Sequence, residues 1–352
     1  MRPAPPFTKA ALAGWSRHAG PDCLDSASLE EVLAPVLERL KLPRGLLAQM
    51  TGISSRRLYP AGSPVIRGGF LAAQALLDRF PHLKQQIDLH FSTSVGRDFL
   101  EPSAASSVSA QLELGPQVRN MDLGSACLGF VDALELAAHL IEFDRVRYVL
   151  VTAGENSRPL LENTLEFLLE NKVTVREFFR SFASLTLGSG GAAMLVGPAS
   201  EHPAAPRIRG AVSLADTKSN DLCRGDFSAM VTDAAGLMTA GVRLAGETFR
   251  LGRETYGWTP DCFDSIICHQ VSRANTDKLC RDLELPAERV FRTYPDYGNM
   301  GPVAVPFSFD LAWEKGLIRP GRRTALMGIG SGLACSMMEL DIPAEPAGFS
   351  ES

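Results

Sequence analysis

Short runs of apolar and β-branched residues recur along the chain, and between them apolar residues repeat every three or four positions. The runs predict strands that are buried on both faces, and the helical spacing predicts amphipathic helices between them. This alternation is typical of an α/β fold. The predicted strands cover residues 88–96, 118–124, 147–154, 192–198, 208–214, 264–271, 323–332 and 334–342.

Four further segments show the spacing of an amphipathic helix, and a charge-rich helical region lies around residues 160–182. A Pro- and Ala-rich stretch at 198–210 divides the chain into halves, residues 1–200 and 201–352, and each half ends in a Gly-rich strand. We therefore expect a structural duplication, with frayed ends at PAPP and PAEPAGFSES. The four predicted helices cover 28–42, 70–80, 127–143 and 230–252.

Composition narrows the class of protein. Of 352 residues, 45% are hydrophobic and 21% charged, and the net charge of −5 disfavours nucleic-acid binding. The seven cysteines are odd in number and none has the spacing of a zinc site, which favours free thiols in a reducing compartment, the cytoplasm. The first 15 residues do not resemble a signal peptide, and no apolar run is long enough for a membrane helix.

Cys127 lies between a short predicted strand and an apolar helical run, in NMDLGSACLGFV. The small residues Gly124, Ser125 and Ala126 permit a tight turn into that helix. A cysteine there is close to unpaired N–H groups and the positive end of the helix dipole, which favour the thiolate of a nucleophile. A buried structural thiol is the commoner role of such a residue, and geometry alone leaves both roles open.

His269 and Asn299 also lie at element ends. His269 follows an apolar strand and precedes a predicted helix, and active sites of open α/β sheets gather at that end of a strand. Asn299, in YGNMGPVAVP, either occupies a left-handed turn position or donates a hydrogen bond from its amide into a pocket. A packing role for the histidine and a turn role for the asparagine are the commoner alternatives.

Two Gly-rich pieces, GSGG (188–191) and GIGSGLAC (328–335), lead into strands rather than into a helix N-terminus. This context excludes a nucleotide-binding loop and favours close approach of the backbone to another segment or to a ligand. Glu101, in FLEPSAAS, is followed by proline and is predicted in a loop or at a helix start. Taken alone, it is an ordinary glutamate near a helix N-terminus.

Taken together, these motifs resemble the thiolase-fold condensing enzymes, especially ketoacyl synthase III and its relatives. The resemblance covers nearly the whole chain, through TGISSRRLY, DLGSACLGFV, HQVSRAN, YGNMGPVAVP and GIGSGL in that order. The segments TSVGRDFLEPSAASSVS and LCRGDFSAMVTD are most similar to the OleA type, the head-to-head acyl-CoA condensing enzymes of bacterial long-chain olefin synthesis. The resemblance implies two pseudo-duplicated halves in five layers, α-β-α-β-α, with the cysteine in the first half and the histidine and asparagine in the second.

The resemblance also implies a mechanism. Cys127 accepts an acyl group from acyl-CoA, and the backbone amides of Cys127 and Ser331 stabilise the oxyanion. A plain acyl-CoA has no carboxylate to lose, so its α-carbon needs a base, which is Glu101 delivered from the partner subunit of a homodimer. His269 Nε2 and Asn299 then hydrogen-bond the enolate oxygen. The expected product is a 2-alkyl-3-keto acid, made without a metal or a cofactor.

Two long acyl chains and one pantetheine arm must meet at Cys127, so three channels are expected to converge there. FRSFASLTLG and the surplus of phenylalanine (18 residues) are candidates for their walls, although core packing explains them equally well. The CoA phosphates need surface cations. The candidates are Arg56, Arg57, Arg224 and Arg273.

Two alternatives stay open. A decarboxylative ketoacyl synthase III, which extends a starter with a malonyl donor on a carrier protein, uses the same Cys-His-Asn set, and Glu101 argues against it. A non-catalytic paralogue that binds acyl chains or stabilises a partner usually loses its nucleophile, whereas Cys127, His269 and Asn299 are all present. Chain-length preference, the fate of the product and any downstream pathway enzymes are not determined by the sequence.

Overall fold

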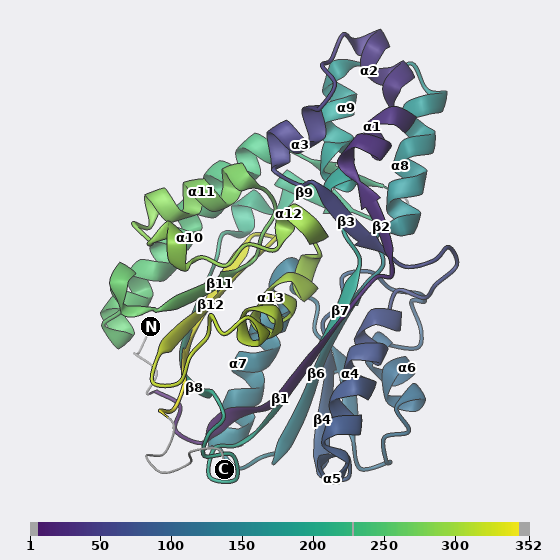
Figure 1. The fold of residues 1–352 in the computed structure, drawn as a ribbon. Helices are drawn as coiled ribbons and strands as arrows, with labels where there is room; N and C mark the ends of the chain where they lie inside the picture. The colour runs from purple at the N-terminus through teal and green to yellow at the C-terminus, as the bar shows by residue number, and fades with distance from the viewer. Residues whose placement is uncertain (1–5, 227–228, 345–352) are drawn as a thin grey trace.

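The computed structural model describes residues 6–226 and 229–344. In this part of the chain nine strands form one mixed sheet in the order β11-β12-β13-β8-β1-β7-β6-β4-β5 (Figure 1). All eight strands predicted from the apolar runs are present, so the α/β class is confirmed. The strands are β1 (Ala10–Ala19), β4 (Ile87–Ser92), β5 (Arg119–Asp122), β6 (Tyr148–Glu155), β7 (Gly190–Pro198), β8 (Arg207–Ala215), β11 (Ser265–Cys268), β12 (Arg323–Gly330) and β13 (Ala334–Asp341).

The sheet contains the same arrangement twice. In the first half, β4 is parallel to β6, and β6, β7 and β1 follow in antiparallel order. In the second half, β11 is parallel to β12, and β12, β13 and β8 follow in antiparallel order. Even β5, parallel to β4, has a counterpart in the isolated parallel bridge between Ile266 and Val290. The strands of the two halves meet at one residue pair, Ala11 opposite Arg207. The boundary at residue 200 itself stays a prediction.

Two central helices, α7 (Gly129–Glu142) and α13 (Ala304–Glu314), contact strands of both halves. The two faces of each strand pack differently, as period-two side chains require. Val149 and Val151 of β6 belong to the core around the central helices, whereas Tyr148 and Leu150 pack with the outer helix α4 (Arg67–Arg79). On the second half, α10 (Ala234–Tyr256) covers the outer face. The two halves of the sheet therefore form two β layers on either side of the central helices, and α4 and α10 cover their outer faces. This is the five-layered α-β-α-β-α arrangement that the resemblance implies.

A smaller group of helices lies beyond one end of the sheet (Figure 1). Its apolar side chains form a separate core cluster, and a short two-stranded sheet, β2 (Asp22–Asp25) with β3 (Ser55–Leu58), leads into it. Beside the cavity described below, β9 (Cys223–Gly225) pairs with β10 (Met230–Thr232). Two further α-helices are long, namely α8 (Arg158–Glu170) and α11 (Arg273–Asp282). The short α-helices, of eight residues or fewer, are α1 (Ser26–Val32), α2 (Ala34–Leu40), α3 (Leu46–Thr51), α5 (Pro81–Lys84), α6 (Ala104–Gln111), α9 (Val175–Ser181) and α12 (Tyr294–Tyr297).

Several local expectations need correction. The predicted helix at 28–42 is two helices, because Pro35 cannot supply the backbone N–H that a continuous helix needs. The predicted helix at 230–252 begins only at Ala234, after strand β10. Residues 345–352 of the PAEPAGFSES tail and residues 3–5 of the PAPP start lie outside the described residues. Within 6–226 and 229–344, no helix has both the length and the apolar character needed to cross a membrane.

The largest miss is β1, for which the apolar runs predict nothing although it lies in the middle of the sheet. Its sequence, AALAGWSRHA, is rich in residues that are depleted in strands. The small side chains serve close packing: a Cβ at Gly14 would lie 2.8 Å from Leu76 Cδ1 of α4. Tertiary packing, rather than local propensity, therefore makes this segment a strand.

Candidate active site

Cys127 lies in a one-turn 3₁₀ helix, η1 (Ala126–Leu128), between β5 and α7. The preceding residue, Ala126, has a φ of 48°, a left-handed conformation that costs a non-glycine residue on the order of 1 kcal/mol or more. This sharp turn is stabilised by its surroundings and holds Cys127 at the start of the long buried helix.

The Gly-rich strand β12 packs directly against this turn. A Cβ at Gly330 would lie 2.6 Å from the Ser125 carbonyl oxygen, and one at Gly328 would lie 2.8 Å from Leu128 Cδ1. GSGG also makes a close approach, since a Cβ at Gly191 would lie 1.9 Å from the Gly68 carbonyl carbon. The prediction that both pieces allow close backbone approach is therefore confirmed.

His269 directly follows β11, and its backbone N–H donates to the Met327 carbonyl oxygen of β12 at 2.7 Å. The imidazole is 8% exposed, and its Nδ1 has no hydrogen-bond partner among the described residues. Burial lowers the pKa of His269 to about 4, with the Gly301 backbone acting in the opposite direction. The ring is therefore neutral near pH 7.

Asn299 enters the site from the loop between α12 and α13. The positive φ values in this loop belong to Gly298 and Gly301, so the left-handed turn role considered for Asn299 is wrong. Its Oδ1 accepts a hydrogen bond from the Gly301 N–H at 3.0 Å. None of the residues in 6–226 and 229–344 accepts a hydrogen bond from the amide nitrogen, so this group can donate to a ligand in the cavity.

These residues meet on one cavity of about 950 Å³, within the range of small-molecule sites. Its walls include Cys127, His269, Asn299 and Ser331, from four segments far apart in the sequence. Four segments that are far apart in the sequence thus contribute to the wall of one cavity. Apolar side chains contributed by both halves and by β10, α8, α10 and α11 line the rest, among them Val95, Leu160, Leu187, Leu237, Met238, Val242, Leu279, Met300, Met327, Ile329 and Met337.

The expectation that phenylalanines line this space is wrong for the described cavity. Of the FRSFASLTLG stretch, Ala183, Leu187 and Gly188 line it. Phe179 and Phe182 instead pack around Phe178 in the core of the helical group. Leucine, methionine, valine and isoleucine thus provide the apolar wall, and these flexible or branched side chains suit an acyl chain without the rigidity of aromatic rings.

The expected thiolate is not favoured in this structure. Burial raises the pKa of Cys127 to about 12, and the nearby Glu155 and Cys223 act in the same direction. The Cys127 backbone N–H lowers the pKa, as expected for a residue at a helix start, but this effect is the smaller one. The cysteine is therefore a thiol before substrate binds, and its proton must leave during acyl transfer.

Glu101 is the one predicted catalytic residue that lies away from this cavity. It is exposed in the segment between β4 and α6, and its neighbour Leu100 reaches the cavity wall. Phe99 and Leu100 are 63% and 78% exposed. The structure of one chain thus brings together Cys127, His269, Asn299 and Ser331, and leaves Glu101 on an apolar surface beside them.

Glu155 is a site residue that the sequence analysis missed. It is the last residue of β6, and its carboxylate lies on the cavity wall near Cys127. Burial raises its pKa to about 7, while hydrogen bonds from the Val95 and Gly96 N–H groups act to lower it. The signal was present: a carboxylate directly after a buried strand is the same pattern that singled out His269.

The four candidate arginines differ in position. Arg56 is 1% exposed and donates to the Ser26 hydroxyl oxygen at 3.0 Å, so its assignment as a surface cation is wrong. Arg57 is half-buried. Arg224 is exposed and ion-paired with Asp221, and Arg273 is the exposed first residue of α11. Gly225 and Asn275, close to these last two arginines in the chain, line the cavity.

Comparison with known proteins places this geometry in a family. Models of 3-oxoacyl-[acyl-carrier-protein] synthase III and of its C-terminal region match residues 121–212 and 254–342. The acyl-CoA:acyl-CoA alkyltransferase of Xanthomonas campestris is 36% identical over 95% of this chain and 99% of its own length. That of Shewanella oneidensis is 31% identical over 94% and 98%. A β-ketoacyl-[acyl-carrier-protein] synthase III of Rhodopirellula baltica is more distant, at 25% over 82% and 88%.

Solved structures agree. A histidine-to-alanine variant of X. campestris OleA superposes with a TM-score of 0.93 at 35% identity, over 96% of this chain and all of the other. A cysteine-to-serine variant of OleA, solved with lauric acid and lauroyl-CoA, gives 0.92 at 36% identity, over 95% and 99%. The duplicated frame and its cavity are thus those of a thiolase-superfamily acyltransferase. Within that class, the chain belongs to the acyl-CoA:acyl-CoA alkyltransferase (OleA) family.

Proposed function

We propose that this enzyme joins two long-chain acyl-CoA molecules head to head by a non-decarboxylative Claisen condensation. The observation that carries the proposal is the set of catalytic side chains. In the family's X. campestris protein, a glutamate, a cysteine and a histidine have been replaced singly. The same numbers of residues separate those three positions as separate Glu101, Cys127 and His269 here.

The first half-reaction is acyl transfer. The Cys127 thiol attacks the thioester carbonyl, neutral His269 is suited to accept its proton, and CoA leaves as its thiol. The backbone N–H groups of Cys127 and Ser331 are proposed to hold the oxyanion. The large apolar cavity supports this step, because it can hold an acyl chain out of water while the thioester forms.

The second half-reaction forms the carbon–carbon bond. Glu101 removes a proton from the α-carbon of a second acyl-CoA, and the resulting enolate attacks the acyl-Cys127 carbonyl and expels the cysteine thiolate. His269 and Asn299 are proposed to stabilise the enolate oxygen, and no described residue accepts a hydrogen bond from the Asn299 amide nitrogen, which supports this role. The product is a 2-alkyl-3-ketoacyl-CoA, which water hydrolyses to the keto acid and CoA.

Glu101 acts, in this proposal, in the partner subunit of a homodimer. Two features support a dimer next to it. β5 is an edge strand of the sheet, and no strand in the described part of the chain pairs with its outer side. Val95, Phe99 and Leu100 expose 53%, 63% and 78% of their surface, a patch that a second copy would cover. Sedimentation at several protein concentrations tests the dimer, and a monomer at all of them would contradict it.

For the CoA phosphates we propose Arg224 and Arg273, because both are exposed and flank cavity-lining segments. Replacing each by methionine should raise KM for acyl-CoA with little effect on kcat. The free thiols agree with a reducing compartment, and we retain a cytoplasmic location as part of the proposal.

The deciding experiment supplies one long-chain acyl-CoA and no malonyl donor, with the products identified by mass spectrometry. We expect a β-keto acid or its ketone carrying both alkyl chains. Product that appears only when a malonyl donor is added would instead establish a decarboxylative ketoacyl synthase III. An enzyme that releases no CoA under either condition would be the acyl-binding paralogue.

A further inference from the structure

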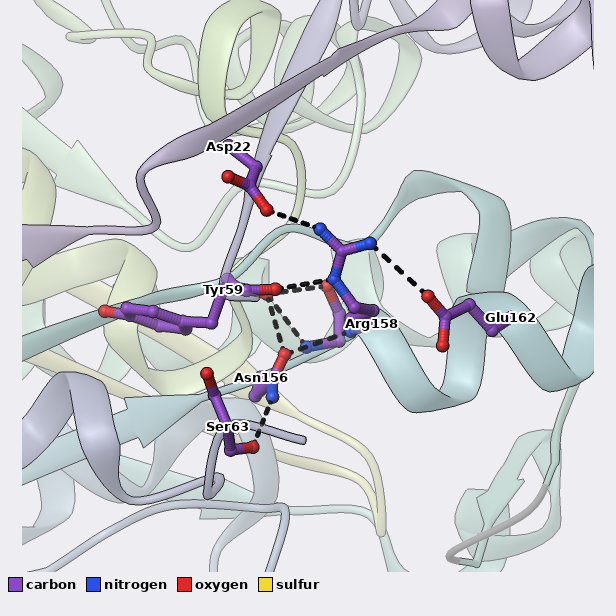
Figure 2. Close-up of polar contacts among 8 residues, drawn as sticks. Asp22, Tyr59, Ser63, Asn156, Arg158 and Glu162 are labelled. Carbon is purple, nitrogen blue, oxygen red and sulfur yellow. Dashed lines mark hydrogen bonds and ion pairs between the residues drawn. The ribbon is translucent and has the colours of Figure 1, made fainter. Parts of the chain in front are cut away.

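Glu155 is held rigidly by its own strand. The next residues fix the end of β6 to the β3 side of the molecule, as Figure 2 shows: Asn156 Nδ2 donates to the Ser63 carbonyl oxygen at 2.8 Å, and Arg158 Nε donates to the Tyr59 carbonyl oxygen at 2.5 Å. Arg158 also pairs with Asp22 at 2.6 Å and with Glu162 at 3.3 Å. The backbone from which the Glu155 side chain projects therefore has little freedom.

From this fixed point the carboxylate reaches the segment that carries Glu101. One oxygen accepts the Val95 N–H at 2.5 Å, and the other accepts the Gly96 N–H at 3.4 Å. Both oxygens are thus occupied by backbone donors of one segment. These contacts therefore indicate a structural link between the end of β6 and the backbone of the segment that carries Glu101.

The rest of the segment shows where that link acts. Ser94 Oγ accepts the Gly154 N–H at 2.9 Å, and the Asp98 carboxylate accepts the Val65 and Ile66 N–H groups at 2.7 and 3.3 Å. At the far end, Ser103 caps α6. The segment is thus held at Ser94 and Asp98 before Glu101, and at Ser103 after it. Between Ser94 and Asp98, the contacts to the backbone come from Glu155.

We infer that Glu155 is a positioning residue, which holds its own chain's Val95–Glu101 segment so that Glu101 is presented to the cysteine of the other subunit. The inference rests on the proposed function, namely on delivery of Glu101 across a homodimer. It places two carboxylates of one subunit in the reaction of the other subunit: Glu155 lies on the cavity of its own site and acts, through the backbone that carries Glu101, on the neighbouring site.

The test is a dimer with a single working site. One subunit carries Cys127→Ala and supplies only Glu101; the other carries Glu101→Gln and supplies only Cys127. With different affinity tags, tandem purification isolates this reference heterodimer. Glu155→Ala is then placed either in the subunit that supplies Glu101 or in the subunit that supplies Cys127. Two readouts are taken with one long-chain acyl-CoA: acyl transfer to Cys127 by intact mass, and condensation product by mass spectrometry.

Glu155→Ala in the subunit that supplies Glu101 should lower condensation about 10- to 100-fold, the effect of a misplaced catalytic group, and leave acyl transfer unchanged. In the subunit that supplies Cys127 the same substitution removes only a carboxylate of the cavity wall, and it should lower condensation far less than in the subunit that supplies Glu101. Glu155→Gln keeps one acceptor oxygen and should give an intermediate loss. Glu162→Gln, which removes an exposed partner of Arg158, is the matched control and should change neither step.

Equal losses in both placements, or a loss only in the Cys127 subunit, would overturn the inference and make Glu155 a residue of its own site. An inactive reference heterodimer would instead overturn delivery of Glu101 in trans, and the positioning role with it. If Glu155→Ala prevents folding, Asp98→Asn provides the second arm. Asp98→Asn weakens the hydrogen bonds that hold the same segment to Val65 and Ile66. The inference stands only if this variant lowers condensation when it is placed in the subunit that supplies Glu101 and not when it is placed in the other.

Discussion

The turn around Cys127 and the segment around Glu101 are built in opposite ways. The turn is half-buried, its Ala126 has a left-handed conformation, and Gly328 and Gly330 let a neighbouring strand pack directly against it. The Glu101 segment projects outward, with Phe99 and Leu100 largely exposed and no contact described for the Glu101 carboxylate. One chain thus brings the proposed nucleophile, Cys127, to the cavity by itself, whereas the proposed base, Glu101, lies on the surface of a segment that is held on both sides of it.

The largest effect is expected from the removal of Cys127, the proposed nucleophile. Cys127→Ala should abolish CoA release and product formation, by on the order of 10⁴-fold or more, because both half-reactions pass through the acyl-cysteine. A thiol assay and intact mass measure the loss. The control is Cys23→Ala, an exposed cysteine of β2, which should match the parent. Parent-like CoA release by Cys127→Ala would remove the cysteine from the mechanism.

The next change separates the two regions. Glu101→Gln should leave acyl transfer to Cys127 within about threefold and lower condensation by about 10²- to 10⁴-fold, as for loss of a general base. Single-turnover mass spectrometry measures the acyl-enzyme, and product analysis measures condensation. Glu31→Gln, another exposed glutamate, serves as the control. A variant that loses acyl transfer as well would show that Glu101 is not confined to the second step.

A third change tests how closely the Cys127 turn is packed. Gly330→Ala places a Cβ against the Ser125 carbonyl oxygen and should lower the free energy of unfolding by about 3 kcal/mol, the upper end for overpacking. Acyl transfer should fall with it, because the turn shifts. Gly246→Ala is matched, since a Cβ there meets nothing within 4 Å and helix propensity favours alanine. Urea denaturation measures the free energy of unfolding of both variants. Equal values for the two would show that the turn accommodates the extra methyl group easily.

The smallest effect concerns His90 of β4, which contacts α6 where the two elements flank the Glu101 segment. Its ring is buried between Ser109 Oγ (2.8 Å) and Thr152 Oγ1 (2.9 Å), and burial lowers its pKa to about 4. Because the unfolded chain binds a proton near pH 6.5 and the folded one does not, this contribution to stability is present above pH 6.5 and is lost as the pH falls toward 4.

From pH 7 to pH 5, His90 alone should lower the free energy of unfolding by about 2 kcal/mol. His269, whose pKa is lowered in the same way, adds to the effect. Urea denaturation at the two pH values measures it, and His90→Gln, which cannot titrate, should show a correspondingly smaller difference. If the free energy of unfolding of His90→Gln changes between pH 7 and pH 5 by as much as that of the parent, His90 is solvated in the folded state.

These contrasts also explain what the sequence reveals. The eight apolar strands and the buried helix after Cys127 are predictable because burial on both faces leaves a direct hydrophobic signal. β1 and its Gly14 give no such signal, since their small residues are selected by neighbours distant in sequence. Motif order singles out Cys127, His269 and Asn299 as candidates, and the fold places all three on one cavity. Motif order does not identify Glu155, whose role depends on two backbone N–H groups that only the fold brings to it.

The central position of β1 has a consequence for synthesis of the chain on the ribosome. β1 is made first among the strands, yet its partners β7 and β8 begin only at Gly190 and Arg207. At typical elongation rates, roughly 10 to 40 seconds pass before either partner has been translated. During that time the nascent chain carries its central strand without neighbours. A ribosome stalled before Gly190 therefore exposes a partnerless strand, and with it the hydrogen-bonding edge most prone to misassociation.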